Sequence, residues 1–429
     1  MDTIFAVSSG APPAAIAVLR VSGPAACAAA MALAGRLPPP RRAGLRTLRD
    51  PRGGALLDRA LVLVFPGPDS ATGEDIVELH LHGGRAVVAA VEAALAAQPG
   101  LRPAAPGEFT RRALAAGRID LAQAEGLGDL LMAETEAQRR AALSAVEGAV
   151  SRQVGGWNAR LLDLAARTEA LLDFADEEDV TDSAAAIAGL AGDAQVLAGE
   201  IAAALDNPPV ERLRDGIRVV LAGAPNAGKS TLLNALAERE AAIVSPIAGT
   251  TRDRIEAAVI RDGLAFVLTD TAGLVEATDD PIERIGIARA REAMAAADIV
   301  ILLDDTPVPA GPAVVAVHPR SDQQGRESGE PGRLAVSART GAGVAALWRA
   351  IVEAGRGLVP RLDRLVLNRR QREAIAAAQA ALVDASTETD PLLIAEHLRL
   401  ARTALDRVTG ASDTEAMLDA LFGRFCIGK

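Results

Sequence analysis

The chain has 429 residues, half of them hydrophobic, and a net charge of −11 at pH 7. This length predicts about three domains, and the acidic balance argues against a generally basic nucleic-acid coat protein, although it leaves room for a local basic surface. Cys27 and Cys426 exclude a disulfide framework and favour a reducing, cytoplasmic location. No leader pattern and no charge-free apolar run of about 18 residues is found, so we expect no membrane segment.

Residues 1–118 are predicted to form a compact α+β domain. Short apolar runs predict strands, alanine-rich stretches predict helices, and proline-rich turns separate them. The predicted strands are 4–7, 16–21, 60–65 and 76–81, and the predicted helices are 24–34 and 84–98.

The residue composition and hydrophobic pattern of the remaining chain change twice. Residues 119–213 are poor in proline and place Leu127, Leu130 and Leu131 at helical spacing, and residues 358–429 are helical again. Between them, residues 214–357 alternate strand and helix patterns. The predicted fold class is therefore α/β plus α, with the N-terminal α+β domain, a helical domain split into two parts that pack together, and an inserted Ras-like P-loop domain.

Residues 223–230 (Gly-Ala-Pro-Asn-Ala-Gly-Lys-Ser) match the phosphate-loop spacing G-x-x-x-x-G-K-[ST]. The apolar run 217–221 before the motif predicts a strand, and residues 231–237 predict the opening of a helix. Such a unit directs backbone N–H groups and a helix N-terminus at one place, which suits a polyphosphate. We expect Lys229 to contact the β- and γ-phosphates and Ser230 to bind Mg²⁺.

Two further segments predict the switches of a GTPase. Thr250 and Thr251 offer hydroxyls to the γ-phosphate and the metal, and Asp270 to Gly273 follow a predicted strand at 265–269 with a carboxylate for Mg²⁺. With a guanine-contacting loop at 337–338, these segments resemble the translation-factor-like GTPases. The predicted nucleotide-binding residues are Asn226, Ala227, Gly228, Lys229, Ser230, Thr231, Ser245, Pro246, Ile247, Ala248, Gly249, Thr250, Thr251, Asp270, Thr271, Ala272, Gly273, Asp322, Ser337, Ala338 and Arg339, with Ser230 and Thr251 expected on Mg²⁺.

The guanine motif departs from the usual pattern. After a predicted strand at 313–317 the chain has Pro319 where an asparagine is usual, and proline has no side-chain amide to offer. Asp322 can still accept from the N1–H and the exocyclic amine of guanine.

Segments in all three domains are similar to one family. The stretches 2–6, 17–23, 65–68, 72–80, 82–84, 106–113 and 118–125, with the C-terminal Cys-Ile-Gly-Lys at 426–429, resemble the MnmE (TrmE) family of bacterial tRNA-modifying GTPases. Two departures are an altered loop at 11–15 and Arg118 where lysine is common. The resemblance covers essentially the whole chain.

The resemblance implies how the nucleotide is hydrolysed. Leu274 stands where Ras-like proteins have the glutamine that orients water, so another device is needed. The family implies that K⁺ supplies the missing positive charge, that Glu283 orients water, and that Cys426 takes part in uridine modification. The implied K⁺ ligands are Asn226, Ser245, Ile247 and Thr250.

The resemblance also implies partners and a second cofactor. Arg20, Glu78, Arg118 and Lys429 match positions that bind a 5-formyl- or methylene-tetrahydrofolate, and Lys429 requires a second chain or a folded-back tail to reach them. The implied function is a K⁺-stimulated, Mg²⁺-dependent GTPase and homodimer. With an FAD-dependent MnmG-type partner, as a heterotetramer, it adds a carboxymethylaminomethyl or aminomethyl group to C5 of the wobble uridine (U34) of tRNA.

Three questions stay open at this level. An Era-like regulatory GTPase of ribosome assembly is the alternative function, and a modification scaffold with a decayed nucleotide site is a third hypothesis. The dense arginine run at 361–372 either contacts tRNA phosphates or covers a helix surface.

Overall fold

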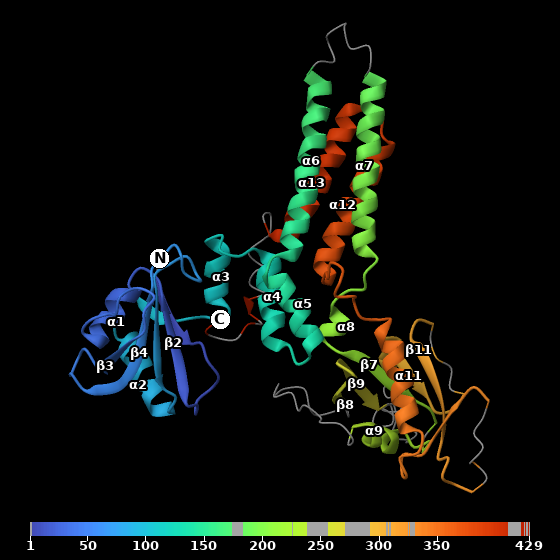
Figure 1. The fold of residues 1–429 in the computed structure, drawn as a ribbon, viewed down its shortest axis with the longest axis horizontal. Helices are drawn as coiled ribbons and strands as arrows, with labels where there is room; N and C mark the ends of the chain where they lie inside the picture. The colour runs from blue at the N-terminus through green and yellow to red at the C-terminus, as the bar shows by residue number, and fades with distance from the viewer. Residues whose placement is uncertain are drawn as a thin grey trace, which may run out of the picture. The chain divides into compact units, whose positions relative to one another are not determined.

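The computed structural model shows two compact units, each with a sheet and a core of its own. The described residues are 2–173, 183–224, 226–237, 256–270, 292–305, 308, 310–324, 326, 331–410, 422, 423, 425 and 428. Contacts group residues 1–128 with 406–429 in the first unit and residues 129–405 in the second (Figure 1).

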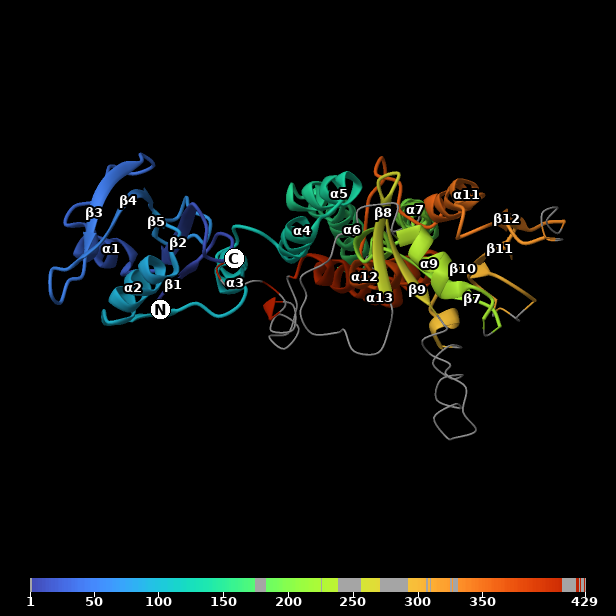
Figure 2. The ribbon, with the colours of Figure 1, turned by 90° about the horizontal axis from the view of Figure 1, so that it is seen from below.

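The first unit is built on a six-stranded sheet with the order β3-β4-β5-β2-β1-β6. The strands are β1 (Thr3–Val7), β2 (Ile16–Ser22), β3 (Gly44–Arg49), β4 (Leu56–Phe65), β5 (Ile76–His82) and β6 (Leu101–Pro103). The helices are α1 (Ala26–Ala34), α2 (Arg85–Ala96), α3 (Glu108–Ala115) and the start of α4 (Leu121–Met132). Helices α1 and α2 lie beside the sheet (Figure 2). Their apolar positions are buried with inward residues of the strands such as Leu19 and Leu79. Because side chains alternate along a strand, neighbouring Arg20 and Glu78 project from the other face.

The described C-terminal residues belong to this first unit. The hydroxyl of Ser8 donates to the carbonyl oxygen of Gly428 at 2.7 Å. Gly428 has φ +94°, and a Cβ at that position would lie 2.0 Å from the carbonyl oxygen of Val7, so only glycine fits. The chain therefore folds its own C-terminal end back onto the end of β1, which is the folded-back alternative considered for Lys429. Lys429 itself lies outside the described residues.

The helices of the second unit form a bundle whose long members lie side by side (Figure 1). They are α5 (Glu136–Val146), α6 (Ala149–Asp173), α7 (Ser183–Leu205), α12 (Arg369–Thr387) and α13 (Pro391–Thr409). The short α8 (Glu211–Arg214) follows α7 in the chain. Leucines and isoleucines at helical spacing, such as Leu197, Ile201 and Ile375, are buried in the bundle. Helix α7, from the first predicted helical part, packs on α12, from the second.

Helix α7 over Ala184–Leu205 is long and apolar enough, by length and composition, to cross a membrane. It packs on α12 and α6, and its acidic side chains form ion pairs: Asp193 with Arg167, and Glu200 with Arg160. These are the contacts of a helix in a bundle.

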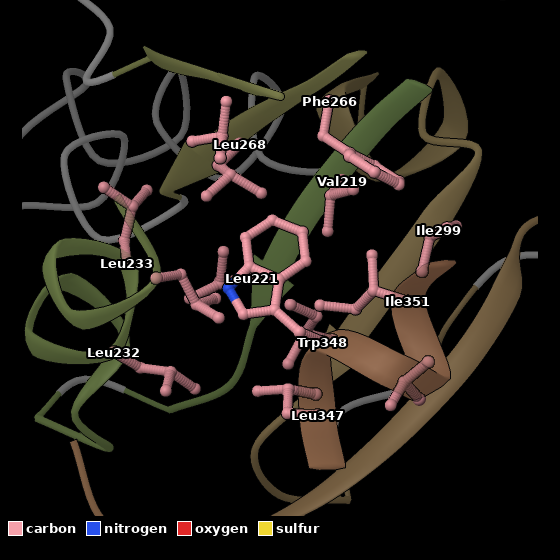
Figure 3. Close-up of a cluster of buried hydrophobic side chains, with 14 of the residues drawn as sticks. Val219, Leu221, Leu232, Leu233, Phe266, Leu268, Ile299, Leu347, Trp348 and Ile351 are labelled. Atoms are coloured by element: carbon pink, nitrogen blue, oxygen red, sulfur yellow. The ribbon is translucent and has the colours of Figure 1, made fainter. Parts of the chain in front are cut away.

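The second unit also holds a six-stranded sheet with the order β12-β11-β10-β7-β9-β8, in which all neighbours are parallel except β8, which runs antiparallel to β9. The strands are β7 (Ile217–Ala222), β8 (Glu256–Arg261), β9 (Leu264–Asp270), β10 (Ile299–Leu302), β11 (Ala313–Pro319) and β12 (Leu334–Val336), with helices α9 (Lys229–Ala237) and α11 (Val344–Arg356). Figure 3 shows the buried indole of Trp348 among Leu221, Leu347 and Ile351. Its ring meets that of Phe266 edge-on, with centroids 5.5 Å apart.

Buried side-chain amide groups hold the segments that connect the bundle to this sheet. The Gln138 side chain donates to the carbonyl oxygens of Leu213 and Arg214 at 2.9 and 3.0 Å, and the Asn207 side chain donates to those of Arg361 and Leu365. Gln138 and Asn207 are 8% and 2% exposed. The two side-chain amides thus provide hydrogen-bond donors to backbone carbonyl oxygens of the connecting segments, as buried backbone groups require.

All the strands expected from the sequence are present, but β3, β6, β8, β10 and β12 were missed. The described C-terminal residues group by contacts with the first unit, whereas residues 358–429 were expected to belong to the helical domain. The predicted domain limits stay predictions.

Candidate functional site

The phosphate-loop sequence lies where its pattern requires, between β7 and α9. Strand β7 is central in the sheet and buried, and the helix begins at Lys229. Gly228 has φ +100° and Asn226 has φ +63°, conformations that glycine and asparagine tolerate best. The loop conformation therefore follows from residue types that the motif itself contains.

Lys229 is buried, at 4% exposure, and its ammonium donates to the carbonyl oxygens of Gly223 and Ala224 at 2.8 and 2.9 Å. Burial lowers the pKa of Lys229, while the charges of Asp270 and Asp304 act in the opposite direction. A cation held at a helix N-terminus by two weak acceptors is suited to an anionic phosphate.

Ser230 and Asp270 meet beside this lysine. The Ser230 hydroxyl donates to the Asp270 carboxylate, although the two residues are 40 positions apart. Asp270 is the last residue of β9, and the pairing of β7 with β9 brings its carboxylate to the loop. A hydroxyl and a carboxylate oxygen side by side fit the all-oxygen coordination that Mg²⁺ prefers. The predicted Ser230 and Asp270 are thus brought together.

A pocket of about 440 Å³ adjoins the loop. It unites three chain segments that the sequence had assigned to nucleotide binding. Its lining is Ala227, Gly228, Thr231, Leu232, Pro319, Arg320, Asp322, Gln323, Gln324, Val336, Ala338 and Arg339. Strands β7, β11 and β12 are parallel, so the segments that follow them all begin at the same edge of the sheet. The pocket therefore lies at the carboxyl ends of the strands.

Asp322 lines this pocket, and the buried Ser337 holds its carboxylate. The Ser337 hydroxyl donates to Oδ1 of Asp322 at 2.7 Å and accepts from the Thr340 backbone N–H at 3.1 Å. This hydroxyl hydrogen bond, above all, lowers the pKa of Asp322, so its carboxylate is ionised at neutral pH.

Sequence reasoning missed two contributors to the site. The Asp304 carboxylate accepts from the backbone N–H of Ala224 in the phosphate loop, and the Arg320 guanidinium donates to the carbonyl oxygen of Asn226. Asp304 follows β10, one of the strands that was missed. An acidic residue after a buried parallel strand next to β7 would have been the signal for it.

In the first unit, the pairing of β2 with β5 sets Arg20 directly opposite Glu78. The guanidinium donates to Oε1 of Glu78 at 2.8 Å and lies over the ring of Phe109, 5.8 Å from its centroid. Burial acts to raise the pKa of Glu78, but Arg20, helped by His80, outweighs it and lowers the pKa. The predicted Arg118 pairs with Asp69 instead, at 3.8 Å.

Several predicted site residues lie outside the described residues. They are Glu283, Cys426, Ser245, Pro246, Ile247, Ala248, Gly249, Thr250, Thr251, Thr271, Ala272, Gly273 and Lys429. Their roles stay predictions, and so does the whole K⁺ site, of whose predicted ligands Asn226 lies among the described residues.

The arginine run at 361–372 is partly engaged within the protein. The Arg372 guanidinium donates to the carbonyl oxygens of Leu205 and Asn207 just after α7, and Arg361 pairs with Asp363 at 2.9 Å. Arg372 therefore has a structural role, because its positive charge binds carbonyl oxygens at the C-terminus of α7.

Two family models match the chain. The model of the GTP-binding protein TrmE N-terminus matches residues 3–118, and that of the MnmE helical domain matches residues 121–426. The tRNA modification GTPase MnmE of Rhizorhabdus wittichii is 58% identical over 431 residues, which cover 100% of this chain and 97% of the relative. The protein of the same name from Erythrobacter litoralis is 56% identical over 430 residues and all of both chains.

A structure of Era from Aquifex aeolicus bound to GDP and aluminium fluoride is 24% identical, covers 41% of this chain and 69% of its own, and has a TM-score of 0.26. That similarity is too low to favour the Era-like alternative. Both family models and relatives that match over their whole length lead to the same assignment. The chain belongs to the MnmE family of tRNA modification GTPases.

Proposed function

We propose that this protein is a Mg²⁺-dependent, K⁺-stimulated GTPase that acts in tRNA modification. The observation that carries the proposal is the convergence of Lys229, Ser230 and Asp270 at one end of β7, beside the pocket that contains Asp322. Lys229 would hold the phosphates, and Ser230 and Asp270 would hold Mg²⁺, which neutralises phosphate charge when bound. The named relatives support the same activity.

The finer reaction is part of the proposal. With an FAD-dependent MnmG-type partner, the protein would modify C5 of the wobble uridine of tRNA with a one-carbon unit from a tetrahydrofolate. Arg20 and Glu78 would bind the folate, because a carboxylate can pair with pterin donors and a guanidinium with its carboxylates. Cys426 would act in the modification, and GTP hydrolysis in a homodimer would drive a conformational cycle rather than form the carbon–carbon bond.

Steady-state GTP hydrolysis in matched KCl and NaCl tests the GTPase part. We expect stimulation by KCl alone, and its loss in Asn226→Gly, which removes the amide while keeping the left-handed backbone (φ +63°) unstrained. Asn158→Gly, an amide on α6 of the same unit, is the control and should keep the stimulation. Equal, very slow rates in both salts would reject the cation mechanism.

Titration with 5-formyl-tetrahydrofolate tests the folate part separately. Binding should be lost in Glu78→Ala and kept in Glu92→Ala, which removes a carboxylate of α2 in the same unit. Unchanged binding in Glu78→Ala would place the folate elsewhere.

A further inference from the structure

The first peptide unit of the phosphate loop, which joins Gly223 to Ala224, lies between two opposite charges. We propose that Asp304 is a positioning residue for nucleotide binding: its carboxylate fixes the orientation of this peptide unit and, through it, that of the Lys229 ammonium. The inference rests on the proposed function. It assigns a role in that function to a residue outside the phosphate-loop motif and the predicted switches.

Both polar groups of the peptide unit are engaged. Its carbonyl oxygen, on Gly223, accepts from Nζ of Lys229 at 2.8 Å, and its N–H, on Ala224, donates to Oδ2 of Asp304. The carbonyl oxygen and the N–H of a planar trans peptide point in opposite directions, so the unit lies between ammonium and carboxylate with its dipole aligned. Hydrogen bonds in such a chain strengthen one another. The peptide unit therefore cannot turn without losing a hydrogen bond to a charged group.

The pairing of β7 with β10 brings Asp304 to the loop. The two strands are parallel, with Leu302 opposite Ala222, and the N–H of Leu303 donates to the carbonyl oxygen of Ala222 at 2.9 Å. Asp304 is the next residue, and its Oδ2 lies 3.5 Å from the place that a Cβ at Gly223 would occupy. Strand register thus delivers the carboxylate to the side of this glycine.

Asp304 is in turn held by a guanidinium from the neighbouring part of the sheet. Arg333, which immediately precedes β12, donates to the carbonyl oxygen of Asp304 at 3.1 Å and to that of Val317 in β11 at 3.4 Å. The Arg333 side chain is 14% exposed. Asp304 is therefore fixed relative to three strands. A phosphate loop that is ordered before the nucleotide arrives loses less binding free energy to ordering.

Displacement of a fluorescent GDP analogue from the full-length protein in Mg²⁺ tests this inference, with GDP and GMP as competitors. GMP has the base and the α-phosphate, but it lacks the β-phosphate that Lys229 is expected to contact. GDP should bind to Asp304→Ala about tenfold more weakly than to the unmodified protein, because a hydrogen bond to a charged group is lost. The affinity for GMP should change by less than about twofold, because the base pocket stays intact.

Two further variants separate the hydrogen bond from other effects of the substitution. Asp304→Asn keeps a side-chain oxygen that can accept from the Ala224 N–H, so GDP should bind only about threefold more weakly. Because asparagine has nearly the shape of aspartate, this variant also serves if Asp304→Ala does not fold, which circular dichroism shows. Asp305→Ala is the matched control: it removes the adjacent carboxylate, which is 98% exposed, and should leave both affinities unchanged.

The outcomes separate the inference from the proposed function. If GDP binds to Asp304→Ala as tightly as to the unmodified protein, the inference is wrong while the proposed function stands. If Asp304→Ala weakens GDP and GMP by the same factor, or if Asp304→Asn loses tenfold or more in GDP affinity, the carboxylate does not act through this hydrogen bond, and the inference is equally wrong. If the unmodified protein does not bind GDP, the proposed function fails, and the inference fails with it.

Discussion

The phosphate loop of the second unit and the Arg20–Glu78 pair of the first unit both place charged side chains at a candidate site, but they are assembled differently. Lys229 donates to carbonyl oxygens six and five positions earlier in the chain. Arg20 and Glu78 are 58 positions apart and meet only because β2 and β5 pair in one register. The first arrangement depends on local backbone conformation, and the second depends on strand register.

The difference shows in burial as well. Lys229 is almost fully buried, whereas the Arg20 and Glu78 side chains are 26% and 16% exposed. A charge removed from a buried, preorganised site should cost more than a charge removed from a partly solvated pair. Three substitutions test this order.

The largest effect is expected for Lys229→Ala. Removing the ammonium should lower kcat for GTP hydrolysis by about a hundredfold or more, because a preorganised charge at the phosphates is lost. Circular dichroism should stay unchanged, since the hydrogen bonds that its ammonium donates within the described residues go to carbonyls of its own loop. Arg349→Ala on the exposed face of α11 removes a charge in the same unit and should leave kcat unchanged. A kcat within tenfold of the unmodified protein would contradict a local phosphate site.

Gln138→Leu tests buried polar contacts between segments far apart in the chain. We expect its effect to lie between those of the buried Lys229 and the partly solvated Arg20–Glu78 pair. The side chain is buried, and its amide donates to carbonyl oxygens 75 and 76 positions away. We expect the free energy of unfolding to fall by about 2–4 kcal/mol, because several backbone groups lose their partners at once. Urea denaturation followed by circular dichroism measures it.

The matched control for that change is the next residue of α5. Arg139 forms an exposed ion pair with Glu136, so Arg139→Ala should cost below about 0.5 kcal/mol. Equal costs for the two substitutions would show that the buried contacts of Gln138 add nothing to stability.

The smallest effect is expected for Arg20→Met, and it should depend on pH. Because Arg20 lowers the folded-state pKa of Glu78, the pair stabilises the protein above the unfolded pKa of about 4.3, and this contribution is lost as pH falls through the folded-state pKa. Solvent screening keeps it below about 1 kcal/mol. Urea denaturation at pH 7 and pH 3 should show a smaller pH difference for Arg20→Met than for the unmodified protein.

Arg59→Met on β4 is the control for this pH effect, since Arg59 is exposed on the same sheet. If the difference in the free energy of unfolding between pH 7 and pH 3 is the same for Arg20→Met as for the unmodified protein, Arg20 does not stabilise the charge of Glu78, although strand register places the two side chains together.

Local sequence was sufficient for the phosphate loop. The strand, the glycine-rich turn and the helix start each depend on residues within a few positions, and the structure has all three at 217–237. Most strands with strong apolar runs were predicted for the same reason, but β10, a buried apolar run of four residues, was missed. Strands β3 and β6 lack such runs: β3 contains two arginines and a single buried residue, Leu48, and β6 has three residues. Weak patterns of this kind acquire strand structure only from their neighbours.

Contacts between distant segments were beyond prediction. Nothing near Gln138 in the sequence indicates that it would hold Leu213 and Arg214, and nothing near Asp304 indicates the backbone N–H of Ala224. Arg372 lies in a basic run that was left open between nucleic acid and a helix surface, and the structure places its guanidinium at the end of α7. Each of these contacts joins a polar side chain to backbone atoms, which leave no signature in residue type.

By itself, the sequence determined the family resemblance, the phosphate loop with Lys229 and Ser230, and the departure at Pro319, because these depend on residue identity at short spacing. Only the tertiary structure decided that Asp270 meets Ser230, that Ser337 holds Asp322, and that Arg20 faces Glu78. These pairs follow from sheet order and register, which the burial of apolar strands and helices against one another sets across the whole unit.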